Sequence, residues 1–212
     1  MNRRIIVTLT SWPGRIKNVA AVLKTILKQT TPPDLIEINL SLLEFPNKEK
    51  DLPNDLQELI EQNKQIEINW CEDNTYTFKK LIPTLKKFLG ENYYLVSIDD
   101  DLLFKENFIE KSIDELEKLG VSAFNFSSSQ ILGNRQVYKS EIFDKDFWEN
   151  LTQKFIDSRH DDGYIFYYLK YVKNVRFNCH PTRERMFSVY NPVLPTNKAV
   201  KYVPFSEIHK LL

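Results

Sequence analysis

Three consecutive aspartates in the middle of the chain are the strongest chemical signal in the sequence. Asp99, Asp100 and Asp101 directly follow the apolar residues 93–98, which are typical of a buried strand. Adjacent carboxylates repel one another, so we expect a compensating cation beside them. Asp99 and Asp101 face the same side of an extended backbone. Because paired carboxylate oxygens suit Mg²⁺ or Mn²⁺, these two residues are predicted metal ligands. The alternative is a solvated acidic turn that caps the following helix.

A second acidic group stands at the start of a helix that the sequence predicts over residues 161–172. Asp161 and Asp162 follow His160 and precede a stretch rich in aromatic residues. Carboxylates at a helix N-terminus are favoured by the helix dipole, which accounts well for one of them. The functional interpretation is a general base that takes a proton from an acceptor hydroxyl. The residues alone leave both interpretations open.

Basic and hydroxyl side chains at two other places are suited to binding a nucleotide. Lys79 and Lys80 are adjacent, and we expect one of them to be solvated and the other to reach a diphosphate. Thr10, Ser11 and Arg15 follow the first predicted strand and can hold a nucleotide. An ordinary turn between strand and helix, with Ser11 as the helix cap, explains this second group equally well.

The elements that must position these groups alternate between strand and helix. Short β-branched runs predict strands, and apolar residues at helical spacing predict helices. This alternation predicts an α/β fold with a mostly parallel sheet and helices on both faces. Ligands of such sheets bind beyond the carboxyl ends of the strands, so the loops that follow the strands are the informative places. The expected strands are 5–10, 35–42, 66–70 and 93–98, and the expected helices are 16–28, 55–62, 76–89 and 108–119.

The second half of the chain is less regular. Residues 121–126 and 175–177 are strand-like, and residues 131–138 are typical of one arm of a hairpin. The end of the chain, residues 196–212, mixes three lysines with apolar side chains. We expect this tail to fold back and pack on the rest of the chain, and the alternative is weak contact with an anionic membrane surface.

Composition argues against several classes of protein. With 212 residues, 42% of them hydrophobic, the chain is long enough for one folded domain. Lys and Arg together number 29, as do Asp and Glu, and this balance argues against a general nucleic-acid binder. Cys71 and Cys179 form no CxxC pair, which favours a reducing compartment. No apolar run is long enough to span a membrane, and no glycine-rich phosphate loop or dinucleotide fingerprint is present.

Taken together, these segments resemble a nucleotide-sugar glycosyltransferase of the GT-A fold, similar to the family-2-like bacterial enzymes of capsule and lipopolysaccharide synthesis. The DDD and KKLIPTLKK pieces carry most of the resemblance. It covers most of residues 5–108 and a short piece near residue 160. The matched stretches are IIVTLTSWPGRI, LKTILKQTTPPDLIEINLSLLEFP, INWCEDNTYTFKKLIPTLKKF, YYLVSIDDDLLF and HDDGYIFYYL.

The resemblance implies an α/β fold of the GT-A (Rossmann-like) type, with a mostly parallel sheet flanked by helices in a single catalytic domain over residues 1–212. Residues 1–104 would form the donor-nucleotide half, 105–195 the acceptor half and 196–212 a C-terminal tail. The implied enzyme is a metal-dependent glycosyltransferase of the hexosyltransferase type, with Mn²⁺ or Mg²⁺ as cofactor. It would move a sugar, with inversion, from a nucleotide-sugar donor, expected to be a UDP-sugar. The acceptor would be a saccharide or a lipid-linked saccharide in surface polysaccharide synthesis.

The resemblance also implies roles for single residues. The family's Asp-x-Asp element holds the metal on the donor diphosphate, and it maps onto Asp99 and Asp101. The family's acidic pair before a helix maps onto Asp161 and Asp162, with the second acid as the catalytic base. In many relatives, an aspartate in the loop after the second strand contacts the nucleotide base, and this chain has Glu44 there. The implied donor-binding residues are Thr10, Ser11, Arg15, Asp73, Lys80 and Asp100, the last of them near the ribose or the metal.

Two other functions remain open from the sequence. A sugar-1-phosphate nucleotidyltransferase has a related core, but its glycine-rich N-terminal signature is missing here. A non-catalytic carbohydrate-binding or assembly subunit would not need intact acidic clusters. The leading interpretation is a cytoplasmic enzyme without a nucleic-acid partner, in at most peripheral contact with the inner face of the membrane.

Overall fold

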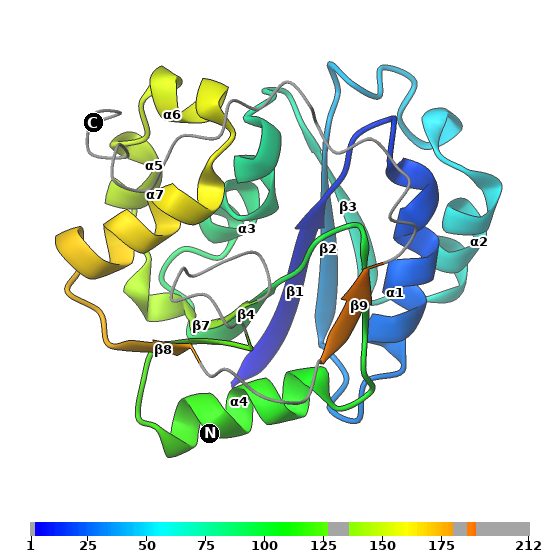
Figure 1. The fold of residues 1–212 in the computed structure, drawn as a ribbon. Coiled ribbons are helices and arrows are strands. Elements are labelled where there is room, and N and C mark those ends of the chain that lie inside the picture. Colours follow the sequence, from blue (N-terminus) through cyan, green and yellow to red (C-terminus); the bar gives the residue numbers. More distant parts are fainter. Residues whose placement is uncertain (1–2, 127–135, 180–185, 190–212) are drawn as a thin grey trace.

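One seven-stranded sheet runs through the molecule (Figure 1). The structure, a computed structural model, describes residues 3–126, 136–179 and 186–189. The strands of the sheet are β1 (Arg4–Thr10), β2 (Leu35–Ser41), β3 (Ile66–Cys71), β4 (Tyr93–Ser97), β6 (Ala123–Asn125), β7 (Gln136–Lys139) and β8 (Phe177–Cys179). Their order is β3-β2-β1-β4-β7-β6-β8, and only β7 runs antiparallel to its neighbours. The expected mostly parallel α/β sheet is therefore confirmed.

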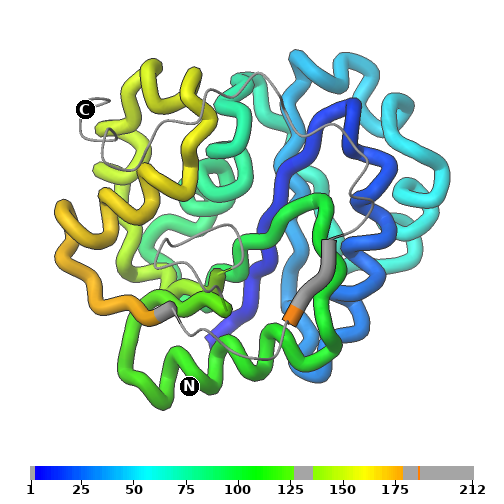
Figure 2. The backbone as a smooth tube through the Cα atoms, viewed as in Figure 1, coloured from blue at the N-terminus to red at the C-terminus, as the bar shows by residue number. Residues whose placement is uncertain are grey.

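Helices cover both faces of this sheet, as Figure 1 shows. One face carries α1 (Val19–Leu27), α2 (Asn54–Gln62) and α4 (Phe108–Lys118). The opposite face carries α3 (Ile82–Lys87), α5 (Asp146–Glu149), α6 (Gln153–Ser158) and α7 (Asp161–Tyr167). The tube in Figure 2 shows α5 to α7, in yellow-green to orange, gathered together on their side of the sheet.

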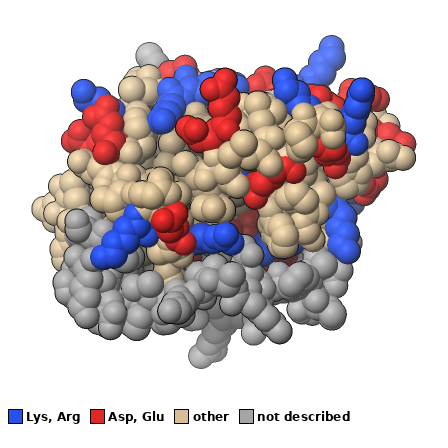
Figure 3. Space-filling model, turned by 90° about the horizontal axis from the view of Figure 1, so that it is seen from above, with Lys and Arg blue, Asp and Glu red and all other residues tan. Residues whose placement is uncertain are grey.

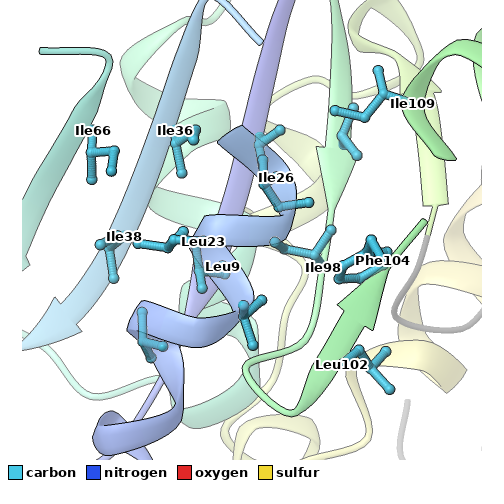
Figure 4. Close-up of a cluster of buried hydrophobic side chains, with 14 of the residues drawn as sticks. Leu9, Leu23, Ile26, Ile36, Ile38, Ile66, Ile98, Leu102, Phe104 and Ile109 are labelled. Carbon is cyan, nitrogen blue, oxygen red and sulfur yellow. The ribbon is translucent and has the colours of Figure 1, made fainter. Parts of the chain in front are cut away.

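The alternation of side chains along β1 produces the two apolar layers. Ile5, Val7 and Leu9 point into the layer beneath α1, whereas Ile6 points into the layer beneath α3. Figure 4 shows Leu23 of α1 beside Leu9 in the first layer. Because β1 is buried on both faces, apolar residues occupy the adjacent positions Ile5, Ile6 and Val7 instead of alternating with polar ones.

One expected helix is divided in two. The sequence predicts a helix over residues 76–89, but the chain forms a 3₁₀ helix, η3 (Tyr76–Lys80), and then the short α3. Pro83 lies in the first turn of α3, where its missing N–H has no helical partner to lose. The division turns both lysines of the pair inward, since Lys79 is 2% exposed and Lys80 is 4% exposed. The expectation that one of them is solvated is therefore wrong.

Several short elements differ from the sequence-based expectation. The helix expected over 161–172 continues from α7 into a π-helix, η5 (Tyr168–Val172). The strand expected over 175–177 instead forms β8, over residues 177–179. A second, two-stranded sheet pairs β5 (Leu102–Phe104) with β9 (Phe187–Val189), and the sequence predicted neither strand. The sequence also did not predict α5 and α6, whose periodicity is too short to detect. Residues 131–135 of the expected hairpin arm, and the tail 196–212, lie outside the described residues.

The order of the strands places the loop after β1 beside the loop after β4. The chain winds from β1 outward through β2 and β3 and then crosses back to β4 on the other side of β1. A reversal of this kind opens a crevice at the carboxyl ends of the two central strands. Strands from both expected halves share the one sheet. Within the described part of the chain, no helix combines the length and the apolar character needed to cross a bilayer.

A buried polar stripe fastens α3 to the sheet. Thr8, Glu37 and Asn39 occupy strand positions that alternate with apolar ones and face α3. The Thr84 hydroxyl of α3 lies 2.9 Å from the Thr8 hydroxyl, 3.0 Å from the Asn39 amide nitrogen and within hydrogen-bond distance of the Glu37 carboxylate. Lys87 adds an ion pair to Glu37, with 2.7 Å between Nζ and Oε1. Since all these groups have partners, the stripe is tolerated inside an apolar layer.

The stripe predicts a stability effect for one hydroxyl group. Thr84→Val keeps the shape of the side chain but leaves the buried Glu37 and Asn39 without their shared partner. We expect the free energy of unfolding in urea to fall by about 1–3 kcal/mol. Thr30→Val, at an exposed hydroxyl bonded to Glu110, should change it by no more than about 0.5 kcal/mol. Equal effects of the two substitutions would contradict the role of the stripe.

Candidate active site

A cleft of about 430 Å³ opens where the central parallel strands end, a volume in the range of small-molecule sites. Figure 3 views the molecule from the side to which the β1 arrow points in Figure 1, and basic and acidic side chains are interspersed on that face. The cleft is lined by Thr10, Ser11, Trp12 and Arg15 after β1, Glu44 after β2, Tyr76, Thr77, Lys79 and Lys80 of η3, Asp99, Asp100 and Asp101 after β4, and Arg159 between α6 and α7.

The cleft brings together most of the residues singled out from the sequence. Among the lining residues are the predicted Thr10, Ser11, Arg15, Lys80, Asp99, Asp100 and Asp101. Asp161 and Asp162 do not line the cleft, but they lie close to Lys80, which does. Asp73 is exposed in the loop after β3 and is not among the lining residues.

Each carboxylate of the aspartate run lies beside a basic side chain. Lys80 Nζ is 2.8 Å from Asp99 Oδ1, and Arg15 Nη2 contacts Asp100 and lies 3.2 Å from Asp101 Oδ2. The compensating cations expected from the sequence are therefore Lys80 and Arg15. Because Asp100 is only 5% exposed, the run is not a solvated turn.

Asp100 is the most buried of the three aspartates and holds the loop after β1. Its Oδ2 accepts a hydrogen bond of 2.6 Å from the Ser11 hydroxyl, and its Oδ1 accepts one from Arg15. Ser11 therefore binds Asp100, and no side-chain cap is present at the start of the following 3₁₀ helix. Burial raises the pKa of Asp100, although Arg15 and Ser11 act in the opposite direction. The middle acid is thus the one that joins the loops after β1 and β4.

Lys80 links the aspartate run to the acidic pair at the start of α7. Its Nζ lies 2.8 Å from Asp99 Oδ1 and 3.4 Å from Asp161 Oδ2, the second contact being an ion pair without hydrogen-bond geometry. Burial by itself would lower the pKa of Lys80, but Asp99, Asp161 and Asp162 together outweigh it and the pKa is raised. The ammonium group is therefore charged, and it holds segments that are far apart in the sequence.

The two acids before α7 differ in exposure. Asp161 is 4% exposed and pairs with Lys80, whereas Asp162 is half-buried. His160 precedes them as the first residue outside the helix, without a side-chain cap. Of the two acids, Asp162 is the less buried, although its Oδ1 is enclosed.

Two carboxylates of the cleft suit a divalent cation. The side chains of Asp99 and Asp101 are 17% and 34% exposed and present hard oxygen ligands, which Mg²⁺ and Mn²⁺ prefer. Within residues 3–126, 136–179 and 186–189, no three His, Cys, Asp or Glu side chains gather as a complete metal site. A cation held here would need further ligands from phosphate oxygens and water, as Mg²⁺ usually does in phosphate sites. The donor set therefore fits a metal that arrives with a diphosphate.

Sequence reasoning missed one wall of the cleft. Arg159 packs against η3, with its guanidinium carbon 4.2 Å from the ring centroid of Tyr76. The Thr77 hydroxyl donates a hydrogen bond of 3.1 Å to the Arg159 carbonyl oxygen. Tyr76 and Arg159 both have positive φ angles, 50° and 56°, which non-glycine residues rarely adopt. No signal in the sequence links these residues, because they are distant in the chain and α6 is too short to predict.

An ion pair between Lys79 and Glu44 forms the part of the cleft wall that follows β2. Lys79 Nζ lies 2.6 Å from Glu44 Oε2, and it also contacts the side chain of Asn74. Glu44 lines the cleft at the place where the resemblance puts the contact with the nucleotide base. The structure therefore assigns different partners to the two adjacent lysines, Glu44 to one and Asp99 to the other.

Solved structures share this fold at low sequence identity. TarS of S. aureus, residues 1–349 in complex with UDP, is 11% identical with a TM-score of 0.58, and the match covers 87% of this chain and 59% of that one. The mannosyltransferase PcManGT of Pyrobaculum calidifontis, in complex with GDP-Man and Mn²⁺, is 14% identical with a TM-score of 0.61, and the match covers 85% of this chain and 55% of that one. This chain thus spans little more than half of either structure.

A third neighbour has a different activity. The 4-diphosphocytidyl-2C-methyl-D-erythritol synthase of Anaerococcus prevotii is 13% identical with a TM-score of 0.56, and the match covers 84% of this chain and 88% of that one. No protein-family model and no curated protein sequence matches the chain. The chain therefore has the GT-A-like fold of nucleotide-sugar glycosyltransferases, a fold that also occurs outside that class.

The ion pairs of Lys80 predict a large stability effect. Lys80→Met leaves the buried Asp161 and the part-buried Asp99 without the Lys80 ammonium, and we expect the free energy of unfolding to fall by about 3–5 kcal/mol. Adding Asp161→Asn should restore part of this loss, because one of the unpaired charges is then removed. The measurement is urea unfolding at neutral pH.

The control for this prediction is Lys17→Met, since Lys17 is exposed on η1 (Ile16–Asn18). It should change the free energy of unfolding by no more than about 0.5 kcal/mol. If Lys80→Met were as mild as Lys17→Met, the buried ion pairs would not hold the cleft together.

Proposed function

We propose that this chain is a metal-dependent inverting glycosyltransferase that moves a hexose from a nucleoside-diphosphate sugar, with UDP as the nucleotide, to a saccharide acceptor. The observation that carries the proposal is the position of Asp99 and Asp101 in a cleft where the strand order reverses. Lys80 lines the same cleft, pairs with Asp99 and lies close enough to Asp162 for their charges to interact. Surface polysaccharide synthesis is the process in which we place this activity. The mannosyltransferase neighbour solved with GDP-Man and Mn²⁺ supports the use of a divalent cation.

The donor would lie against the loops after β1 and β4. Thr10, Ser11 and Arg15 line the cleft and would lie beside the nucleotide, and Glu44 would lie near its base. Asp99 and Asp101 would hold Mn²⁺ or Mg²⁺, which when bound neutralises charge on the leaving diphosphate. Lys80 contributes a fixed positive charge beside Asp99, so no reorganisation is needed as negative charge develops.

The catalytic base is assigned to Asp162. Its carboxylate takes the proton of the acceptor hydroxyl, the hydroxyl oxygen bonds to the anomeric carbon, and the bond from that carbon to the diphosphate oxygen breaks. The nucleoside diphosphate leaves with the electron pair. Asp161, buried against Lys80, keeps the ammonium and the start of α7 in place. The half-buried position of Asp162 supports this division of roles.

A second candidate function is nucleotidyl transfer to a sugar phosphate. The synthase neighbour supports it, because 88% of that chain is covered. The absence of a glycine-rich loop between β1 and α1 counts against it, since close approach of the backbone to a triphosphate favours glycine there.

The cellular setting is also part of the proposal. We place the enzyme in the cytoplasm, with residues 105–195 serving the acceptor and residues 196–212 as a tail in at most peripheral contact with the membrane. A saccharide on a lipid carrier is the acceptor that such a location suits. Co-sedimentation with anionic vesicles at low and high salt tests the membrane contact.

The donor assignment predicts a metal-dependent binding site. With Mn²⁺, the protein should bind UDP and slowly hydrolyse one member of a panel of nucleotide sugars. Asp101→Ala should weaken Mn²⁺-dependent UDP binding about 100-fold or more, because it removes a metal ligand. Asp114→Ala, at an exposed aspartate of α4, is the control and should bind normally.

Calorimetry with and without Mn²⁺ measures this binding. Release of pyrophosphate from a nucleoside triphosphate and a sugar phosphate would favour the nucleotidyltransferase. If UDP and GDP both failed to bind to the wild-type protein, the glycosyltransferase proposal would be wrong.

If Asp162 is the catalytic base, replacing it should lower the rate of transfer without lowering the affinity for the donor. Asp162→Asn keeps the shape of the side chain and removes its basicity, so transfer should fall by about 10²–10⁴-fold while UDP affinity is unchanged. Asp157→Asn, at an exposed residue of α6, should leave transfer unchanged. If Asp161→Asn abolished transfer and Asp162→Asn did not, the roles of the two acids would be reversed.

A further inference from the structure

Arg159 differs from the other cations of the cleft in its partners. Arg15, Lys79 and Lys80 each form an ion pair with a carboxylate of the cleft or of α7. Within the part of the chain that the structure describes, no carboxylate lies within ion-pair distance of the Arg159 guanidinium, which instead lies over the ring of Tyr76. A guanidinium that lines a cleft in this way is available to an anionic ligand.

The backbone at Arg159 is not one that selects arginine. The residue follows the last turn of α6 in the left-handed conformation, with φ of 56°. Glycine or asparagine is the ordinary residue at such a helix end. An arginine is strained there, so local structure does not explain the side chain. A role for its charge in the cleft does explain it.

Tyr76 holds the guanidinium of Arg159 against the wall of the cleft, with 4.2 Å between the guanidinium carbon and the ring centroid. A cation–π contact of this kind attracts the guanidinium to the ring without using its N–H groups as donors to a carboxylate. Tyr76 is itself held with φ of 50° at the start of η3, and Thr77 ties the Arg159 carbonyl to the same segment. The planar fork of donors matches the oxygens of a phosphate group.

We propose that Arg159, oriented by Tyr76, binds a phosphate group of a substrate in the cleft. The inference rests on the proposed function only for the identity of that substrate. Two sources supply the same chemistry: the diphosphate of the nucleotide donor, and a phosphate carried by the acceptor. Arg159 stands two residues before the acidic pair of α7, so its wall of the cleft adjoins both the donor and the base.

The test uses two variants and one control in the full chain. Arg159→Gln removes the charge, and Arg159→Gly also relieves the left-handed backbone. Arg176→Gln is the control, because Arg176 is exposed and lines a different hollow with Leu119 and Phe177. Calorimetry measures three probes: inorganic pyrophosphate, UDP with Mn²⁺, and glycerol 3-phosphate added to protein saturated with UDP and Mn²⁺. Thermal unfolding gives the Tm of every variant.

The expected result is a loss of phosphate affinity without a loss of stability. Both Arg159 variants should bind pyrophosphate or glycerol 3-phosphate about tenfold more weakly or worse, since a charged hydrogen-bond donor is lost. Arg176→Gln should match the wild-type protein. Because glycine suits a positive φ, Arg159→Gly should have a Tm equal to or above that of the wild-type protein.

The three probes separate the sources of the phosphate. Weaker UDP binding in the variants assigns Arg159 to the donor diphosphate. Unchanged UDP binding with loss of glycerol 3-phosphate binding assigns it to an acceptor phosphate. Pyrophosphate binding that depends on Arg159, in a protein that binds neither UDP nor GDP, would leave this inference standing and refute the proposed function.

Two results would overturn the inference. One is phosphate affinity that is the same in wild-type and Arg159 variants for all three probes, or absent in the wild-type protein. The other is a lower Tm of Arg159→Gly together with lost binding, which would make Arg159 a structural residue.

Discussion

One buried ammonium group, that of Lys80, sets the arrangement of the cleft. It lies between Asp99, which follows β4, and Asp161, which begins α7. A buried charge is tolerated only when it is paired, so the positions of these two segments depend on the end of η3, from which Lys80 comes. The backbone of Lys80 is held in turn, because its carbonyl oxygen accepts a hydrogen bond from the buried Thr8 hydroxyl of β1. The central strand, the aspartate run and the start of α7 are thus tied together at one residue.

The three carboxylates of the aspartate run differ in how deeply they are buried. Asp100, the most buried of the three aspartates, is bound by Ser11 and Arg15 and belongs to the framework. Asp99 and Asp101 are more exposed, although Asp99 pairs with Lys80 and Asp101 lies 3.2 Å from Arg15. A divalent cation with its diphosphate would bind these two carboxylates beside the existing ion pairs, in a site whose charges are already partly balanced. The outer two acids are therefore the ones suited to a substrate, and the middle one holds the loops.

The fold by itself does not decide which reaction takes place. Its neighbours include a mannosyltransferase and a synthase of a cytidyl compound, so a GT-A-like sheet serves more than one chemistry. The distinction must come from the site, namely from Asp162, the less buried acid near Lys80, and from the wall formed by Tyr76 and Arg159. Both features lie on the side of the sheet where α5 to α7 gather (Figure 2).

The sequence alone determined the first four strands, the helices α1, α2 and α4, and the place of the aspartate run. Those elements follow from local periodicity, and the run follows from the end of an apolar strand. Only the tertiary structure decided that both Lys79 and Lys80 are buried, that Asp100 faces Ser11 and Arg15, and that Arg159 meets Tyr76. These contacts join residues far apart in the chain, and each depends on how a short helix or turn, with no periodicity of its own, packs against the sheet.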